Sequence, residues 1–236
     1  MSIRPPFRAD QVGSLLRSAP LKAARDRRVH GDIPVAELKA IEDEEIKKLI
    51  ARQEAIGLEG ITDGEYRRSW WHYDFLWNLD GVERIAVEQG IQFAGVQTKA
   101  EAPHVMSKIG FSGHPFVDHF KFLKANTKKT AKQTIPSPSM LHYRGGRKLI
   151  NMGVYPDMND FYHDLGAAYG KAVKAFGDAG CTYLQLDDVS FAYLCDPEQR
   201  KMLKDRGDDP DKQPHIYAGM INKALESKPA GMTVSM

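Results

Sequence analysis

Cysteine is scarce in this chain, and long apolar runs are absent. The 236 residues include two cysteines, Cys181 and Cys195, which form no Cys-x-x-Cys pair. Two such cysteines exclude the disulfide framework that staples many small secreted domains. No stretch approaches the ~18 apolar residues of a membrane span, and the first residues lack the apolar core of a signal peptide. We therefore expect a cytoplasmic protein with no membrane partner.

The sequence also lacks an excess of charge of either sign. Lys and Arg number 33 against 31 Asp and Glu, which gives a formal net charge of +2. Nucleic-acid-binding domains usually present a strongly basic face, so we expect no nucleic-acid partner. The short basic clusters at residues 25–28 and 128–129 contain no aromatic residues. We interpret both clusters as solvated faces.

No Gly-x-Gly-x-x-Gly motif follows any predicted strand, which argues against a dinucleotide-binding fold. The hydrophobic content of 42% is ordinary for a globular protein. The length fits one large domain or two small ones. Because no linker or internal repeat is visible, we treat residues 1–236 as a single domain.

Apolar periodicity predicts strands that alternate with helices. The predicted helices are Pro34–Ile56, Pro115–Asn126, Asp157–Ala179 (capped by Asp157 or Asn159) and Pro210–Glu226. The predicted main strands are Ala9–Ser14, Gly60–Gly64, His104–Ile109, Gln133–Pro138, Cys181–Leu186 and Met232–Met236. Residues 81–98 are interpreted as a β-hairpin excursion. This alternation indicates parallel βαβ units, and a doubly wound sheet and a barrel both fit it.

Function in parallel α/β folds collects at the carboxyl ends of the strands. Small, acidic and hydroxyl residues follow several predicted strands: Val12, Gly13, Ser14, Asp63, Gly64, Glu65, Ser137, Asp187 and Asp188. Each has a plainer interpretation. Asp63-Gly64 is also typical of a turn, and Asp187 or Asp188 would equally well cap a helix or pair with an arginine.

An aromatic cluster follows Glu65 and includes Trp70, Trp71 and Tyr73. Such clusters are more often core or interface than ligand platforms. His72, which lies within it, is more often structural than catalytic in such a setting. Cys181 opens an apolar strand and is interpreted as inert core. We assign no role to Cys195.

Three ordered segments resemble the catalytic barrel of cobalamin-independent methionine synthase, and especially its short single-barrel relatives. The segments are Asp10–Leu15, Thr62–Arg68 and Tyr183–Asp188, the last extending through Asp196. The resemblance runs over nearly the whole chain. It implies a (β/α)8 TIM barrel, with about six of the eight strands in this chain. It also implies methyl transfer from 5-methyltetrahydrofolate to the thiol of homocysteine, which a zinc ion binds as thiolate.

The resemblance places the homocysteine contacts on five residues. Backbone groups around Val12, Gly13 and Ser14 would hold its carboxylate, and Glu65 and Asp187 would hold its ammonium group. Asp188 stands where the larger enzymes usually have Glu, and we assign it no role. Trp71 and His72 are further candidate site residues, and Trp71 would lie on the side of the methyl donor.

The family's zinc ligands are His, two Cys and Glu, and the first two form a His-x-Cys pair after the sixth strand. That strand would be Met232–Met236, so the expected ligands are missing here, and neither cysteine matches a ligand position. We therefore predict an incomplete chain that is inactive by itself. Homo-oligomer formation stays open.

Three alternative functions stay open. The chain would act as another zinc-dependent thiol alkyl transferase of the same superfamily if its thiol or donor differs. It would be a binding module or a non-catalytic remnant if the metal is not supplied. The third alternative is a Mg²⁺-dependent lyase or hydrolase that uses Asp187, Asp188 and His72.

Overall fold

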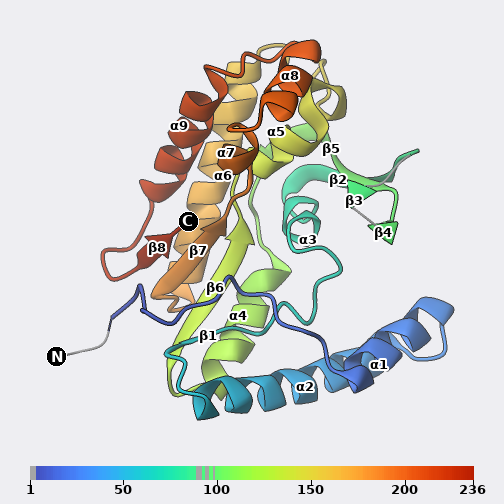
Figure 1. Ribbon diagram of the computed structural model, residues 1–236, viewed down its shortest axis with the longest axis vertical. Coiled ribbons are helices and arrows are strands. Elements are labelled where there is room, and N and C mark those ends of the chain that lie inside the picture. Colours follow the sequence, from blue (N-terminus) through green and yellow to red (C-terminus); the bar gives the residue numbers. More distant parts are fainter. Residues whose placement is uncertain (1–3, 89–91, 94–95, 98) are drawn as a thin grey trace.

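The computed structural model describes residues 4–88, 92–93, 96–97 and 99–236. Its centre is a four-stranded sheet in the order β1-β6-β7-β8, in which every pair is parallel (Figure 1). Antiparallel pairs β2-β5 and β3-β4 lie apart from it. The strands are β1 (Gly60–Ile61), β2 (Asp80–Ala86), β3 (Gln92–Phe93), β4 (Val96–Gln97), β5 (Glu101–Gly110), β6 (Thr130–Pro136), β7 (Tyr183–Asp187) and β8 (Thr233–Ser235).

Helices separate the parallel strands along the chain. They are α1 (Ala19–His30), α2 (Val35–Ala55), α3 (Tyr73–Leu76), α4 (Pro115–Asn126), α5 (Ser139–Gly145), the 3₁₀ helix η1 (Gly146–Leu149), α6 (Met158–Asp178), α7 (Ser190–Tyr193), α8 (Pro197–Asp205) and α9 (Gln213–Leu225). The architecture is an α/β fold with a partial TIM barrel, as predicted. Within the described part of the chain, no helix is long and apolar enough to cross a bilayer.

The core forms between the sheet and α6. Leu184 and Leu186 of β7 are fully buried, as expected for a strand covered on both faces. Helix α6 turns Phe161, Leu165 and Phe176 into the same core and packs against α9. The Asp157 side chain accepts a hydrogen bond from the Asn159 backbone N–H at 2.9 Å, so Asp157 is the N-cap of α6.

Two predicted strands are wrong. Residues 9–14 form no strand, because hydrogen bonds of this segment go to side chains such as Gln11 and Thr62. Residues 104–109 form part of β5, which pairs antiparallel with β2 and stands outside the parallel sheet. The parallel sheet therefore has four strands among the described residues instead of six. The interpretation of residues 81–98 as a hairpin lies partly outside the described residues. Where this segment is described, β2 pairs antiparallel with β5, and β3 pairs antiparallel with β4.

A charged clamp ties the N-terminal segment to the sheet. The Lys132 ammonium group on β6 donates to Asp10 Oδ1 at 2.9 Å and to the Gln11 carbonyl at 2.5 Å. The Tyr183 hydroxyl on β7 donates to the other Asp10 oxygen. Lys132 is buried, and its ammonium lies 4.8 Å from the centre of the Tyr183 ring. The clamp holds the start of the loop that carries Gly13.

Candidate functional site

The loop at Gly13 reaches the end of β1 and packs against Glu65. The Thr62 hydroxyl donates to the Gly13 carbonyl at 2.8 Å, and the Gly13 N–H donates to Gln11 Oε1 at 2.7 Å. Gly13 has φ +119°, and a Cβ there would lie 2.5 Å from Thr134 Oγ1 and 3.1 Å from Glu65 Oε1. Only glycine fits this close approach. The structure thus brings Gly13 and Glu65 together.

Glu65 is held rigidly although its backbone is strained. It is buried and has φ +58°, which is unusual for a residue with a side chain. Its Oε1 accepts hydrogen bonds from Arg68 Nη1 and from the Thr134 hydroxyl, each at 3.0 Å. Burial raises the pKa of the Glu65 carboxyl, and the Arg68 charge opposes that shift. The turn is fixed by Asp63 Oδ1, which accepts from the Glu65 N–H at 2.9 Å.

Asp187 lies at the end of β7 and interacts electrostatically with Glu65. It is half-buried, and burial raises the pKa of its carboxyl above the ordinary value, with Arg68 and Lys132 opposing. Within the described residues, no donor hydrogen-bonds to its side-chain oxygens. A half-buried carboxylate of this kind is prepared to accept hydrogen bonds from a ligand.

Val12 and Ser14 flank Gly13 on the exposed side of the loop. The Val12 side chain is 60% exposed, and Ser14 is exposed as well. Next to them, the Leu15 N–H donates to the Gly64 carbonyl at 3.1 Å. In the part of the chain that the structure describes, the Ser14 N–H has no acceptor. Among the described residues the Val12 N–H has no acceptor either, so the backbone N–H groups of this loop that are open to a ligand are those of Val12 and Ser14, since the Gly13 N–H is engaged by Gln11.

Asp188 has a structural task. Its Oδ1 accepts from the Ser190 N–H at 2.6 Å, from the Ser190 hydroxyl at 2.7 Å and from the Phe191 N–H at 3.2 Å. Its Oδ2 accepts from the Ser139 hydroxyl at the start of α5. Asp188 thus fixes the start of α7 to α5, in agreement with the capping interpretation. The two adjacent aspartates therefore differ in their hydrogen bonding: the Asp188 side chain is occupied by protein donors, whereas among the described residues none hydrogen-bonds to the Asp187 side chain.

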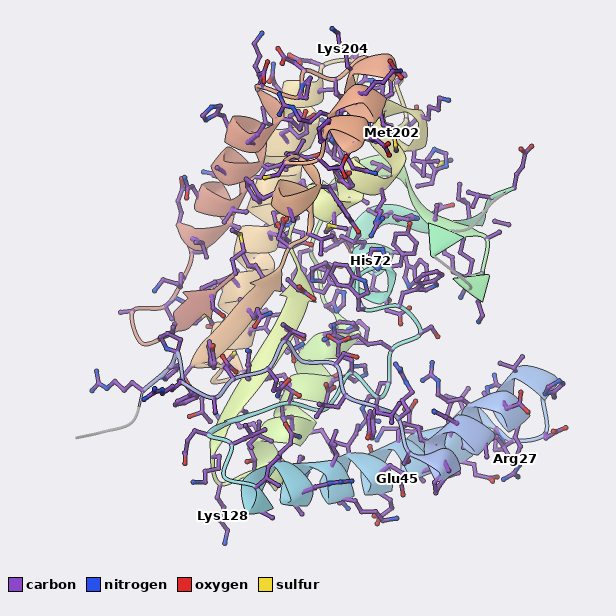
Figure 2. The ribbon with its side chains drawn as sticks, viewed as in Figure 1. Arg27, Glu45, His72, Lys128, Met202 and Lys204 are labelled. Carbon is purple, nitrogen blue, oxygen red and sulfur yellow. The ribbon has the colours of Figure 1, made fainter. Side chains whose placement is uncertain are left out.

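His72 is buried within the aromatic cluster (Figure 2). Its ring stacks on Trp71, with centroids 4.5 Å apart, and on Tyr73, with centroids 4.0 Å apart. Neither ring nitrogen has a hydrogen-bond partner among the described residues. Burial lowers the pKa of His72 to about 3, so the ring is neutral near pH 7. The Trp71 carbonyl accepts from Arg68 Nη1 at 3.0 Å, which links this cluster to Glu65.

The described residues do not offer a metal centre. Among them, no three His, Cys, Asp or Glu side chains are grouped closely enough to hold an ion. Cys181 is buried, with its thiol directed to the Tyr183 carbonyl at 3.2 Å, and burial raises its pKa to about 12. Cys195 is exposed, and its thiol lies 3.5 Å from the Phe191 carbonyl. The zinc ligand set of the resembled family therefore does not fit these residues, and we assign no step to a metal.

Sequence reasoning missed two residues of this site. Arg68 lies in the segment Thr62–Arg68, where the sequence gives it no role, and Thr134 lies inside β6 with no local signal. Arg68 Nη2 donates to the Thr134 carbonyl at 2.5 Å, and the Thr134 hydroxyl donates to Glu65. The three-residue spacing from Glu65 to Arg68, typical of a turn pair, is the one signal that was available.

Comparison with known proteins assigns the family. Residues 7–204 match the family described as the catalytic domain of cobalamin-independent synthase. The uncharacterized protein YxjH of Bacillus subtilis is 46% identical over 232 residues, which cover 98% of this chain and 61% of the relative. A methyltransferase of Thermotoga petrophila, named for 5-methyltetrahydropteroyltriglutamate and homocysteine, is 22% identical over 79% of this chain and 24% of the relative.

Solved structures agree with this assignment. A Listeria monocytogenes protein provisionally named a vitamin-B12-independent methionine synthase superposes with a TM-score of 0.81 at 43% identity, over 99% of this chain and 65% of that protein. A B12-independent methionine synthase from Shewanella, solved in complex with selenomethionine, has a TM-score of 0.60 at 18% identity, over 86% of this chain and 53% of that protein, and it shares the fold. The chain spans about three-fifths of the length of its B. subtilis relative. It belongs to the family of the cobalamin-independent synthase catalytic domain.

Proposed function

We propose that this chain forms the amino-acid-binding part of a methyltransferase that acts on homocysteine. The observation that carries the proposal is the meeting of Gly13, Glu65 and Asp187 at the carboxyl end of the sheet. Ligands of parallel α/β folds bind at this end. Membership of the family supports methyl transfer as the reaction class.

The two carboxylates suit an ammonium group. Burial raises the pKa of both Glu65 and Asp187, because each negative charge has lost water. Nearby negative charges add to both shifts: Asp63 and Asp187 act on Glu65, and Asp188 acts on Asp187. A bound ammonium would restore the opposite charge at both groups through charge-assisted hydrogen bonds. Arg68 already neutralises Glu65 at 3.0 Å. Asp187 is therefore the main ammonium acceptor, and Glu65 orients the group.

The loop suits the other end of the amino acid. We assign the α-carboxylate to the Ser14 N–H, with Val12 and Gly13 shaping the approach. Homocysteine then directs its thiol away from the two carboxylates, toward the open side of the sheet end. We propose 5-methyltetrahydrofolate as the donor, because the Thermotoga relative is named for a folate of this type.

Isothermal titration calorimetry of the 236-residue chain tests the amino-acid site without requiring turnover. Homocysteine should bind, whereas 4-mercaptobutanoate, which keeps the thiol and carboxylate but lacks the amine, should bind about tenfold to a hundredfold more weakly. Asp187→Asn should weaken homocysteine by a similar factor and leave 4-mercaptobutanoate unchanged. Glu83→Gln, an exposed carboxylate on β2, is the matched control. Equal affinity for the two thiols would refute the ammonium assignment.

A further inference from the structure

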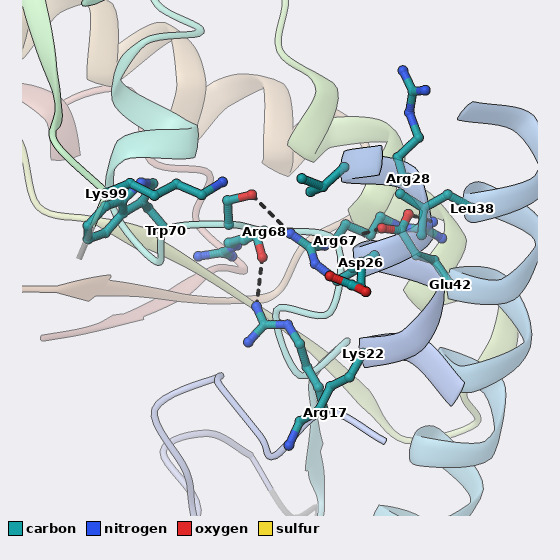
Figure 3. Close-up of a pocket in the computed structure, with 13 residues that line it drawn as sticks. Arg17, Lys22, Asp26, Arg28, Leu38, Glu42, Arg67, Arg68, Trp70 and Lys99 are labelled. Atoms are coloured by element: carbon teal, nitrogen blue, oxygen red, sulfur yellow. Dashed lines mark hydrogen bonds and ion pairs between the residues drawn. The ribbon is translucent and has the colours of Figure 1, made fainter. Parts of the chain in front are cut away.

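We propose that a second, cationic cavity binds a small anion that carries two or more negative charges. The cavity has a volume of about 790 Å³ and lies between α1, α2 and the segment after Glu65 (Figure 3). Its lining contains seven basic side chains but two acidic ones, Asp26 and Glu42. Small-molecule sites have volumes of about 300–1,000 Å³, so the cavity suits a ligand larger than a single ion. The inference does not depend on the amino-acid site.

The acidic side chains do not balance the basic ones. Glu42 is shared by Arg67, at 3.2 Å, and Arg25, at 3.5 Å. Arg67 also pairs with Asp43, and Arg68 pairs with Glu65. In the described ranges, the four remaining lining cations have no carboxylate within ion-pair distance, namely Arg17, Lys22, Arg28 and Lys99. A cavity walled by unbalanced charge concentrates the electrostatic potential and attracts ions of the opposite sign.

The arginines at the base of the cavity are already fixed in place. Arg17 Nη2 donates to the Arg68 carbonyl at 2.7 Å (Figure 3). It also donates to the Glu65 carbonyl at 3.0 Å. Arg25 donates to the Tyr66 carbonyl at 3.1 Å and to the Ser69 hydroxyl at 2.9 Å. An anion therefore meets guanidinium groups that lose little freedom on binding, which favours affinity.

Buried donors in this cavity still lack acceptors. The Nε atoms of Arg17 and Arg67 are buried and have no hydrogen-bond partner among the described residues. The Arg67 side chain is 6% exposed. A buried donor without an acceptor is costly, and both side chains line the cavity, so an anion that drew either Nε into contact would relieve that cost. Burial, together with the nearby Arg25 charge, lowers the pKa of Arg17, as expected where cations crowd together.

Helix α1 contributes several of the basic residues of this cavity, although the sequence alone does not show that they share one face. Lys22, Arg25 and Val29 recur at helical spacing and share the face of α1 that lines the cavity. Arg27, in contrast, pairs with Glu37 outside the lining. The interpretation of residues 25–28 as a solvated face fits residues 26–28, which are exposed, whereas Arg25 is partly buried in the cavity wall.

Either a polycarboxylate or a polyphosphate has the required chemistry, and titration with both separates them. Calorimetry of the 236-residue chain at low ionic strength should show saturable binding, with one site per chain, of citrate, of inorganic pyrophosphate or of both. Added salt should weaken the binding. Binding of one probe alone identifies the chemical class. Absence of saturable binding of both probes overturns the proposal.

Charge reversal at the rim locates the site. Lys22→Glu with Lys99→Glu should weaken anion binding at least about tenfold, because two attractions become repulsions. The control is Lys128→Glu with Lys171→Glu, which makes the same charge change at two exposed lysines outside the cavity. Circular dichroism verifies that each variant is folded, and Lys22→Glu alone serves if the double variant is not. Equal weakening by the control pair overturns the site assignment.

Discussion

Replacement of Gly13 by alanine tests whether the close approach of the loop to β6 is as tight as the structure shows. The backbone at φ +119° is unfavourable for a residue with a Cβ, which costs about 1–3 kcal/mol. The new methyl group would lie 2.5 Å from Thr134 Oγ1 and 2.7 Å from Thr134 Cγ2. Overpacking of this kind costs about 1–3 kcal/mol more. The total of about 2–6 kcal/mol should lower Tm on the order of 10 °C.

Urea unfolding monitored by circular dichroism measures this loss, with Gly31→Ala as the control. Gly31 has φ +84°, but no atom lies within 4 Å of its added Cβ, so only the backbone term of about 1–2 kcal/mol applies. Combination with Thr134→Ala removes both clashing atoms, so the double variant should be less destabilised than the sum of the two single changes. If Gly13→Ala costs no more than Gly31→Ala, or if the effects simply add, the packing argument fails.

Three further changes probe neighbouring groups. Asp187→Asn removes a carboxyl whose pKa in the folded state lies above its ordinary 3.8. The stabilisation from that group is present below pH 3.8 and is lost as pH rises through the folded pKa. The free energy of unfolding in urea should therefore decline less for the variant than for the parent between about pH 4 and about pH 7, and an unchanged slope would contradict the shift. Asp188→Ala should cost about 1–2 kcal/mol by removing the acceptor of the Ser190 and Phe191 N–H groups at the start of α7, yet leave homocysteine affinity in calorimetry intact, and a lost affinity would show that it touches the ligand. His72→Phe should make the free energy of unfolding less sensitive to acid. The pKa of His72 is lowered from 6.5 to about 3, so the neutral ring stabilises the folded state above pH 6.5, and about 2 kcal/mol of that stabilisation is lost by about pH 5. Identical pH profiles of parent and variant would refute that view.

The fold was predictable where local pattern and burial agree. Helix α6 and strand β7 have a clear period and a clear end, so both were confirmed. Helix α1 was missed because only Leu21 and Ala24 of its residues are buried, which leaves little apolar period to detect. Strand β5 has the composition of a sheet strand, but nothing local states whether its partner is parallel or antiparallel.

The residues of the candidate site that follow strands were predictable from the sequence, whereas the residues that hold them in place were not. Glu65 and Asp187 follow from the rule that ligand groups collect at the carboxyl ends of strands, since they come at or just after the ends of β1 and β7. The same rule pointed to Gly13 only through a predicted strand that the structure does not form. Thr134 donates to Glu65 across 69 positions of sequence, and such a contact leaves no periodic signal. Asp188 carried the same local signal as Asp187, and only the positions of Ser139 and Ser190 distinguish them.

The clamp on Asp10 has a consequence for the order of folding. Asp10 is joined to Lys132 across 122 positions and to Tyr183 across 173. Closure of such long segments is entropically unfavourable until β6 and β7 are already side by side. The segment that leads into Gly13 therefore settles late, after the sheet has formed. During synthesis it waits until Tyr183 has left the ribosome, so ligand-binding competence arises after most secondary structure is in place.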